Sequence, residues 1–434
     1  MTRNSSLKNS FIALIFIILS NQLFSQQTDS LLNGLKISLE LRPRAEYTYN
    51  YALPPNDTVS PFLFITQRNR LSISYARPKW LIKSDFQEIH YWDKFQSSAK
   101  VGSINFYQLF VETKFKGLNI RAGRQSVLLD NGRIFSDAPW AQQSRAHEGI
   151  RIMHRAKQLR NDLFLLFTRN YGNQFEPTFS PVAAHRYKYL FIHHLNYNVS
   201  KAFSFNTINA LDIFKNESSG NTYHRFTSGG RIEVKNNRWY YTLNTYLQYG
   251  HNPQGKKLLA YYIQPEIKMS VQKSTIRFGA ELLSGSSPGL SANQSGDFDV
   301  LYGVAWKFMG NMNVFTRFPA DVAGKGLINP YLFILLPLDK KISLRSDSHL
   351  FYTQYNLLNE TGQPQNKYVG FESDISLRYI PAKNLDVNYG FSFLKSSSSM
   401  KYLPKIQNEK QIAVWSYLMV SYTLNILHLK PKAK

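Results

Sequence analysis

An alternation of apolar and polar positions dominates this chain. Between Leu35 and Leu41 the odd positions are apolar, while the even positions from Lys36 to Thr48 are polar or charged. A period of two is typical of a β-strand with one oily face and one wet face. The same alternation recurs in residues 63–75, 226–235, 259–270, 275–283, 342–352, 369–379 and 385–393, and helical spacing is nowhere sustained.

The lengths of these segments and of their connections indicate a membrane barrel. Many segments run for about 12 to 15 residues, whereas strands of globular domains average about 5 or 6 and a strand that crosses lipid needs about 9 to 11. Short turns alternate with long polar stretches, as in outer-membrane barrels with tight periplasmic turns and long outer loops. The short turns include residues 76–79, 115–117, 236–238, 272–274, 337–340 and 381–384. The long stretches are residues 50–61, 93–103, 129–146, 171–185, 285–326, 356–366 and 398–409.

The predicted fold class is therefore all-β, a transmembrane antiparallel barrel of about 18 strands. Strands are expected to begin near residues 35, 62, 80, 104, 118, 147, 161, 187, 202, 223, 239, 258, 275, 327, 341, 367, 385 and 410. An even number returns both termini to the periplasm. Residues 301–308 could form a further strand, which we place inside the long connection. A soluble sandwich or propeller is less favoured, because a soluble core would not leave one face of so many long strands this polar.

The N-terminus has the features of a secretory signal. Basic residues precede an apolar run from Phe11 to Leu19, and a short polar segment ends at Ser25. We expect residues 1–25 to be a signal peptide and residues 26–434 to form the barrel; a transit peptide is the alternative. The expected location is the outer membrane of a Gram-negative bacterium.

Composition and charge narrow the chemistry. The 434 residues carry no cysteine, 15% aromatic and 18% charged residues, and a net charge of +24, or +22 without residues 1–25. The absence of cysteine excludes disulfides and thiolate metal sites. No window approaches about 18 consecutive apolar residues, so a helical membrane protein is excluded. Aromatic clusters such as Trp239 to Tyr241 fit the headgroup level of a bilayer.

The face opposite the oily one carries many arginines and should line the lumen. These arginines are Arg42, Arg44, Arg68, Arg70, Arg121, Arg151, Arg225, Arg231, Arg277, Arg345 and Arg378. The carboxylates on the same face are Glu40, Glu46, Glu112, Glu233, Glu266, Glu281, Asp347, Glu372 and Asp374, so part of the wall is expected to be ion-paired scaffold. A barrel of this size encloses a channel unless loops plug it, and arginines that line a channel select anions.

One block of sequence resembles a known family. Leu118 to Gln125, Asp130 to Arg133, Trp140, Arg145 and Glu148 to Ile152 resemble the signature of the alginate-export family of outer-membrane barrels. Weaker matches are Glu40 to Glu46, Arg68 to Leu71, Phe278 to Glu281, Ser284-Gly285, Asp297 to Asp299 and Tyr302-Gly303.

The resemblance implies an 18-stranded barrel with an Arg-rich constriction through which an anionic polyuronate passes. It implies pore contacts for the matched arginines, and for Trp140 either sugar stacking or a role as a loop anchor. The candidate pore and substrate-binding residues are Arg42, Arg44, Arg68, Arg70, Arg124, Arg133, Trp140, Arg145 and Arg151. Ser126 and His147-Glu148 depart from the family pattern, so alginate itself is not implied as the cargo.

The predicted function is a passive channel for anionic solutes, with an anionic polysaccharide or oligosaccharide as cargo; the alternative is a general diffusion porin for small anions. We expect no enzymatic activity, no cofactor and no metal. The expected partners are outer-membrane lipid and lipopolysaccharide, an anionic sugar polymer and periplasmic transport proteins, but not nucleic acid. A barrel-embedded hydrolase is disfavoured, because the Gly-x-Ser-x-Gly string at 285–289 lacks the strand–turn–helix setting of a nucleophile. His193 and His194 point to opposite faces of a strand and cannot form a metal pair.

Overall fold

The fold is a closed antiparallel β-barrel, seen in a computed structural model that describes residues 32–50, 61–92, 103–168, 187–216, 220–404 and 412–429. The strands are β1 (Leu35–Tyr49), β2 (Phe62–Ala76), β3 (Trp80–Tyr91), β4 (Ser103–Phe115), β5 (Leu118–Gln125), β6 (His147–Arg155), β7 (Leu159–Phe167), β8 (Tyr189–Asn198), β9 (Phe203–Lys215), β10 (Thr222–Asn236), β11 (Trp239–His251), β12 (Lys257–Val271), β13 (Ser274–Leu283), β14 (Gln294–Ser295), β15 (Leu327–Pro337), β16 (Ile342–Tyr352), β17 (Tyr368–Ala382), β18 (Leu385–Ser396) and β19 (Ile412–His428). Two short 3-10 helices, η1 (Ala320–Val322) and η2 (Ser398–Tyr402), complete the elements.

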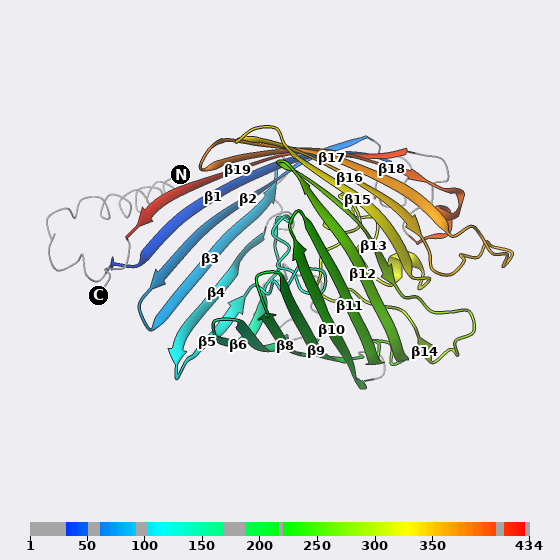
Figure 1. The fold of residues 1–434 in the computed structure, drawn as a ribbon, viewed down its shortest axis with the longest axis horizontal. Helices are drawn as coiled ribbons and strands as arrows, with labels where there is room; N and C mark the ends of the chain where they lie inside the picture. Colours follow the sequence, from blue (N-terminus) through cyan, green and yellow to red (C-terminus); the bar gives the residue numbers. More distant parts are fainter. Residues whose placement is uncertain are drawn as a thin grey trace, which may run out of the picture.

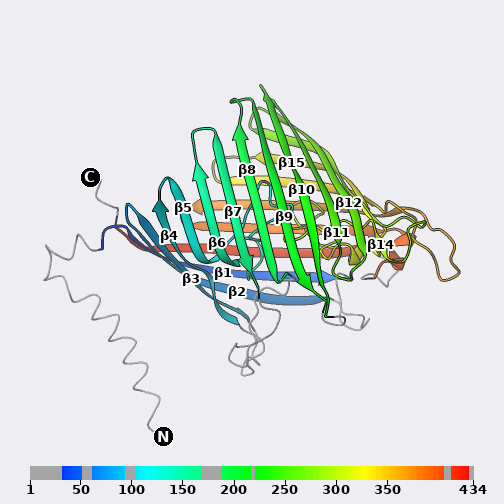
Figure 2. The ribbon, with the colours of Figure 1, turned by 90° about the horizontal axis from the view of Figure 1, so that it is seen from below.

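Pairing between the first and last long strands closes the barrel. From β1 to β13 each strand pairs antiparallel with the next, β13 pairs with β15, the order continues to β19, and β19 pairs with β1. The two-residue β14 stands apart because it pairs in parallel with β12. The wall therefore consists of 18 strands, and Figures 1 and 2 show it from two directions.

The period-two pattern of the sequence becomes an outer face and a lumen. Along β11, exposed and buried positions alternate, with Leu243 and Leu247 on the exposed side and Asn244 and Gln248 on the buried side. Exposed residues of the wall are mostly aliphatic or aromatic, so the outer surface is an apolar band, while the polar and charged side chains of the wall are concentrated at inward positions. This is the distribution that a barrel in lipid requires. In the parts of the chain that the structure describes, no helix has the length and apolar character needed to cross a membrane.

Two connections fold into the lumen and pack against each other. We call residues 126–146 the first inner segment and residues 284–326 the second inner segment. They meet at a bridge between Phe135 and Tyr302, and Ser136 and Tyr302 exchange backbone hydrogen bonds with the opposite segment. Together with inward side chains of the wall, they form a cluster of buried apolar residues that includes Phe298, Phe308 and Phe315. Figure 1 shows the teal and yellow connections within the ring of strands.

The predicted wall agrees closely with the structure. Each of the 18 long strands begins within two residues of its predicted start, although β5, β6 and β7 are shorter than expected at 8, 9 and 9 residues. Residues 301–308 do lie in the long connection, but they form no strand; the extra strand is β14 instead. The signal peptide expected at residues 1–25 lies outside the described residues.

Candidate functional site

Four predicted arginines on β1 and β2 hold the first inner segment. Arg42 donates hydrogen bonds to the carbonyl oxygens of Pro139 and Ala141, each at 2.8 Å, and to Trp140 at 3.2 Å. Arg68 bonds Glu40 at 2.5 Å and the carbonyl oxygens of residues 141 and 142. Arg44 donates to the Trp140 carbonyl, and Arg70 to Ser144 Oγ. A guanidinium has five donors in a rigid plane, so one side chain can satisfy several loop carbonyls at once.

Trp140 is one of the loop residues that these arginines hold. The Arg44 guanidinium lies 4.1 Å from the centre of its ring, and the rings of Trp306, Trp415 and Tyr417 pack around it at 5.5 to 6.1 Å. Of the two roles that the sequence left open, these contacts are those of a loop anchor.

The other family-matched arginines occupy three different environments. Arg124 pairs in register with the exposed Leu109 and forms an ion pair with Glu148, so it lies on the outer face of the wall rather than in the lumen. Arg133 is 1% exposed, and its Nε lies 2.7 Å from Glu281. Arg145 donates to the carbonyl oxygens of Tyr302 and Gly303 in the second inner segment, and burial lowers the pKa of its guanidinium.

Ion pairs occupy most of the remaining predicted lumen arginines, which confirms the expected scaffold. Arg121 pairs with Glu112, Arg225 with Asp212 and Asp299, and Arg378 with Asp386. The bond from Arg225 to Asp299 ties β10 to the second inner segment at 2.9 Å.

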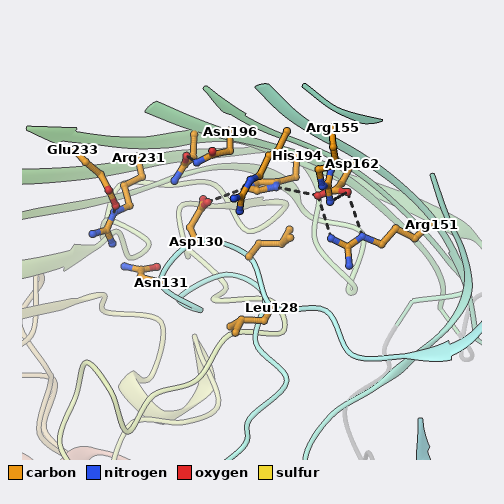
Figure 3. A pocket seen from close by; sticks show the side chains of 13 residues that line it. Leu128, Asp130, Asn131, Arg151, Arg155, Asp162, His194, Asn196, Arg231 and Glu233 are labelled. Atoms are coloured by element: carbon orange, nitrogen blue, oxygen red, sulfur yellow. Dashed lines mark hydrogen bonds and ion pairs between the residues drawn. The ribbon is translucent and has the colours of Figure 1, made fainter. Parts of the chain in front are cut away.

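One lumen cavity contains cations that are balanced by carboxylates (Figure 3). This arginine–carboxylate cavity has a volume of about 430 Å³. Asp162 accepts hydrogen bonds from Arg151 and Arg155, and His194 Nε2 lies 2.8 Å from Asp130. Arg151, a candidate residue from the matched block, lines this cavity.

A second cavity of about 590 Å³ adjoins it, since Asn131 and Arg231 line both. We call it the lysine cavity. Its lining residues are Asn131, Arg231, Lys235, Tyr240, Thr242, Gln264, Glu266, Lys268, Arg277, Trp306, Lys307, Phe308 and Arg345. These include six cationic side chains and one carboxylate, so its field favours anions.

The arginines and the lysines of this cavity differ in their partners. Arg231 lies 2.6 Å from Glu233, Arg277 2.6 Å from Glu266, and Arg345 2.5 Å from Asp347. Among the described residues, no carboxylate lies within 4.0 Å of the ammonium groups of the lysines. The lysines are Lys235, Lys268 and Lys307. Their charge is therefore available to a solute.

Strand register brings the lysines of the wall together. Lys235 of β10 is opposite Tyr240 of β11, Tyr240 is opposite Lys268 of β12, and Lys268 is opposite Arg277 of β13. The Nζ atoms of Lys235 and Lys268 lie 5.6 and 4.5 Å from the centre of the Tyr240 ring. Lys307 comes from the second inner segment, where partial burial lowers the pKa of its amine. The tertiary fold thus joins one inner segment to a row across four strands.

Sequence reasoning identified Arg231, Arg277 and Arg345 as lumen-facing but missed the three lysines. A signal for two of them was present: Lys235 follows Arg231 and Glu233 at a spacing of two, and Lys268 follows Glu266. Nothing local marks Lys307, because its connection enters the lumen only in the folded chain.

Possible metal ligands and the Gly-x-Ser-x-Gly string bear on the hydrolase alternative. No group of three or more His, Cys, Asp or Glu residues among the described residues is placed to hold a metal ion. The Gly-x-Ser-x-Gly string lies in irregular backbone after β13, where Ser286 accepts a hydrogen bond from the Gly296 amide. The arrangement suits weak, reversible contact with an anion.

Comparisons with known proteins establish the fold. No family model matches the chain, and no curated protein matches it. Solved structures do. The outer membrane protein opdK from Pseudomonas aeruginosa aligns with a TM-score of 0.61 and 12% identity, over 90% of this chain and 98% of that one. OccK2 (OpdF) from Pseudomonas aeruginosa, solved in complex with glucuronate, aligns with a TM-score of 0.59 and 11% identity over 91% and 97%.

Acinetobacter baumannii OccAB3 gives a TM-score of 0.60 and 12% identity over 90% and 99% of the two chains. This chain has the fold of these barrels. The likeness covers nearly the whole wall. Because no family model matches, the resemblance to the alginate-export family rests on the quoted residues alone.

Proposed function

We propose that the protein is an outer-membrane channel for small anionic solutes such as carboxylates. The lysine cavity is the observation that carries this proposal: three lysines without a carboxylate partner in the described chain face the lumen beside three paired arginines. Cationic side chains along a water-filled path lower the energy of an anion there and raise that of a cation. The apolar outer face and the closed wall support a location in the outer membrane.

The inner segments favour small solutes over a polymer. They fill part of the lumen with fully buried side chains such as Phe298, Met309 and Met312. Contacts of Arg42, Arg133 and Arg225 connect the inner segments to the wall. The cavities of about 430 and 590 Å³ are in the size range of small-molecule sites. The polysaccharide prediction has less support, because most of the arginines it relied on serve as anchors. A similar barrel that was solved with glucuronate agrees with a small sugar acid as solute.

The test is ion selectivity in planar bilayers across a salt gradient. The wild-type channel should be anion-selective. Replacing all three lysines of the cavity with Gln should lower the anion-to-cation permeability ratio by about threefold or more, because three unpaired charges leave the path.

A matched control removes three charges from short turns between strands, outside the lysine cavity. Lys201→Gln, Lys273→Gln and Lys383→Gln together should leave the ratio close to wild type. An unchanged reversal potential in the cavity variant, or an equal loss in the control, would contradict the proposal.

A further inference from the structure

The short connections of the barrel share one feature: each carries a Lys or Arg. Eight connections of two to four residues join strands at one end of the wall, which we call the short-turn end. Their basic residues, which we call the basic rim, are Arg77, Lys79, Lys116, Lys157, Lys201, Arg238, Lys273, Lys340, Lys341 and Lys383. The only acid in these eight connections is Asp339. Because the strands form a closed ring, the charges are spread around the whole perimeter.

The lysines of the rim are open to the surroundings. All of them are exposed, and none lies within 4.0 Å of a carboxylate in the described parts of the chain. Asp339 is engaged by backbone amides, since its Oδ1 accepts hydrogen bonds from the amides of Lys341 and Ile342 at 2.6 and 2.7 Å. The protein therefore supplies almost no counter-charge of its own here.

Outward-facing aromatic rings lie directly beside these cations. Trp80 follows Lys79, Trp239 follows Arg238, and both indoles are 36% exposed. Phe115 is also exposed, and Lys116 Nζ lies 5.2 Å from the centre of its ring. Aromatic rings favour the level of the headgroups at the edge of an apolar band. The rim thus lies where the phosphates of a bilayer would be.

We propose that the basic rim binds the phosphate headgroups of anionic glycerophospholipids in the leaflet at the short-turn end. This inference rests on the proposed membrane location. Its geometry distinguishes a lipid from a protein partner: a folded acidic protein would contact one sector of the ring, whereas a leaflet surrounds the barrel and meets all eight connections. Exposed basic residues near a membrane surface attract anionic lipids.

The two exposed indoles of this end provide a direct readout. Trp140, Trp306 and Trp415 pack against one another inside the barrel, and Trp92, at the other end of β3, can be removed as Trp92→Phe. In that background, Trp80 and Trp239 report on neighbouring lipid through quenching by brominated chains. Vesicles of phosphatidylcholine are compared with vesicles that contain brominated phosphatidylglycerol or, separately, brominated phosphatidylcholine.

The quenching should show that phosphatidylglycerol is enriched over phosphatidylcholine about fivefold around Trp80 and Trp239. We call this ratio the preference for phosphatidylglycerol, and its size is the factor expected from one basic residue near each headgroup. The preference should shrink at high salt, because exposed charges are screened. In a rim variant that combines Lys79→Gln, Lys116→Gln, Arg238→Gln and Lys273→Gln, it should approach one. A matched control, Lys188→Gln, Lys215→Gln, Lys257→Gln and Lys395→Gln, removes four charges near the other end and should retain the preference.

Three outcomes would overturn the proposal: equal quenching by the two lipids, a preference that survives in the rim variant, or the same loss in the control. Equal quenching by a conducting wild-type barrel overturns the lipid proposal alone. Failure of the wild-type protein to insert and conduct in any vesicle would contradict the membrane location itself.

Discussion

At the scale of single residues, this protein uses arginine mainly to bind its own chain. Arg42 satisfies three loop carbonyls, and Arg145 satisfies two more. Buried carbonyl groups of an irregular segment need partners, because an unpaired polar group in a dry interior costs about 1–3 kcal/mol. The inner segments are irregular and buried, so the wall supplies these donors from side chains.

Arg133 and Glu281 form the most deeply buried ion pair among the residues that the structure describes, with side chains 1% and 0% exposed. Arg133→Met should destabilise the folded barrel by about 3–5 kcal/mol, because it leaves the Glu281 charge buried without its partner. Urea unfolding in vesicles, followed by tryptophan fluorescence, would measure the loss.

The second change Glu281→Gln removes that stranded charge and keeps an oxygen for the Tyr262 hydroxyl, which donates to Glu281 at 2.6 Å. The double variant should therefore recover most of the stability. A single variant as stable as wild type would show that the pair contributes nothing.

A close approach of backbone chains fixes the contact between the inner segments. A Cβ at Gly303 would lie 1.7 Å from the Arg133 carbonyl oxygen, so only glycine allows the second segment to approach the first here. The glycine matches part of the family-like pattern, but the structure gives it a packing role.

At the scale of elements, wall strands and inner segments obey different rules. Each wall strand has an apolar face toward lipid and hydrogen-bonded neighbours on both sides, so its position follows from local alternation. The inner segments are held by side chains from distant strands, as when Met312 donates its amide to Glu372 of β17 and Gln142 donates its side-chain amide to Thr66 of β2. Their path depends on long-range contacts.

The anchoring of the first inner segment predicts a change in conductance. Arg42→Gln should loosen residues 139–142, since it removes the donors for three carbonyl oxygens. We expect a larger or noisier single-channel current, together with faster proteolysis of this segment.

Arg121→Gln is the matched control, because Arg121 bonds Glu112 on the neighbouring strand and, within the described parts of the chain, forms no hydrogen bond with the inner segments. It should leave both the current and the proteolysis rate near wild type. If the Arg42 variant conducts and is cleaved like wild type, the segment is held by other contacts.

At the scale of the whole molecule, a wide wall encloses two inner segments and small cavities. An 18-stranded barrel would leave an aqueous channel if it were empty. Here two inner segments and their apolar cluster occupy part of that space, and the arginine–carboxylate cavity and the lysine cavity beside them are small and polar. Size and charge should therefore both limit what passes.

Uptake by proteoliposomes should separate these limits. A monomeric sugar acid such as glucuronate should enter faster than a neutral hexose of similar size, because the lysine cavity attracts the anion. A long oligouronate should be excluded, since the inner segments narrow the path. Rapid entry of the oligomer would restore the polysaccharide hypothesis and refute the small-solute proposal.

The sequence by itself determined the wall: strand number, strand starts and the inward or outward direction of side chains. These follow from a period of two, which is a local property that lipid on one side and water on the other impose on every strand. Only the tertiary structure decided how the lumen is used. Whether an arginine faces a solute, a carboxylate or a loop carbonyl depends on segments distant in sequence, as Arg133 with Glu281 and Lys307 with Lys268 show. Alternation fixes which way a side chain points, but what it meets there is fixed by the path of the folded chain.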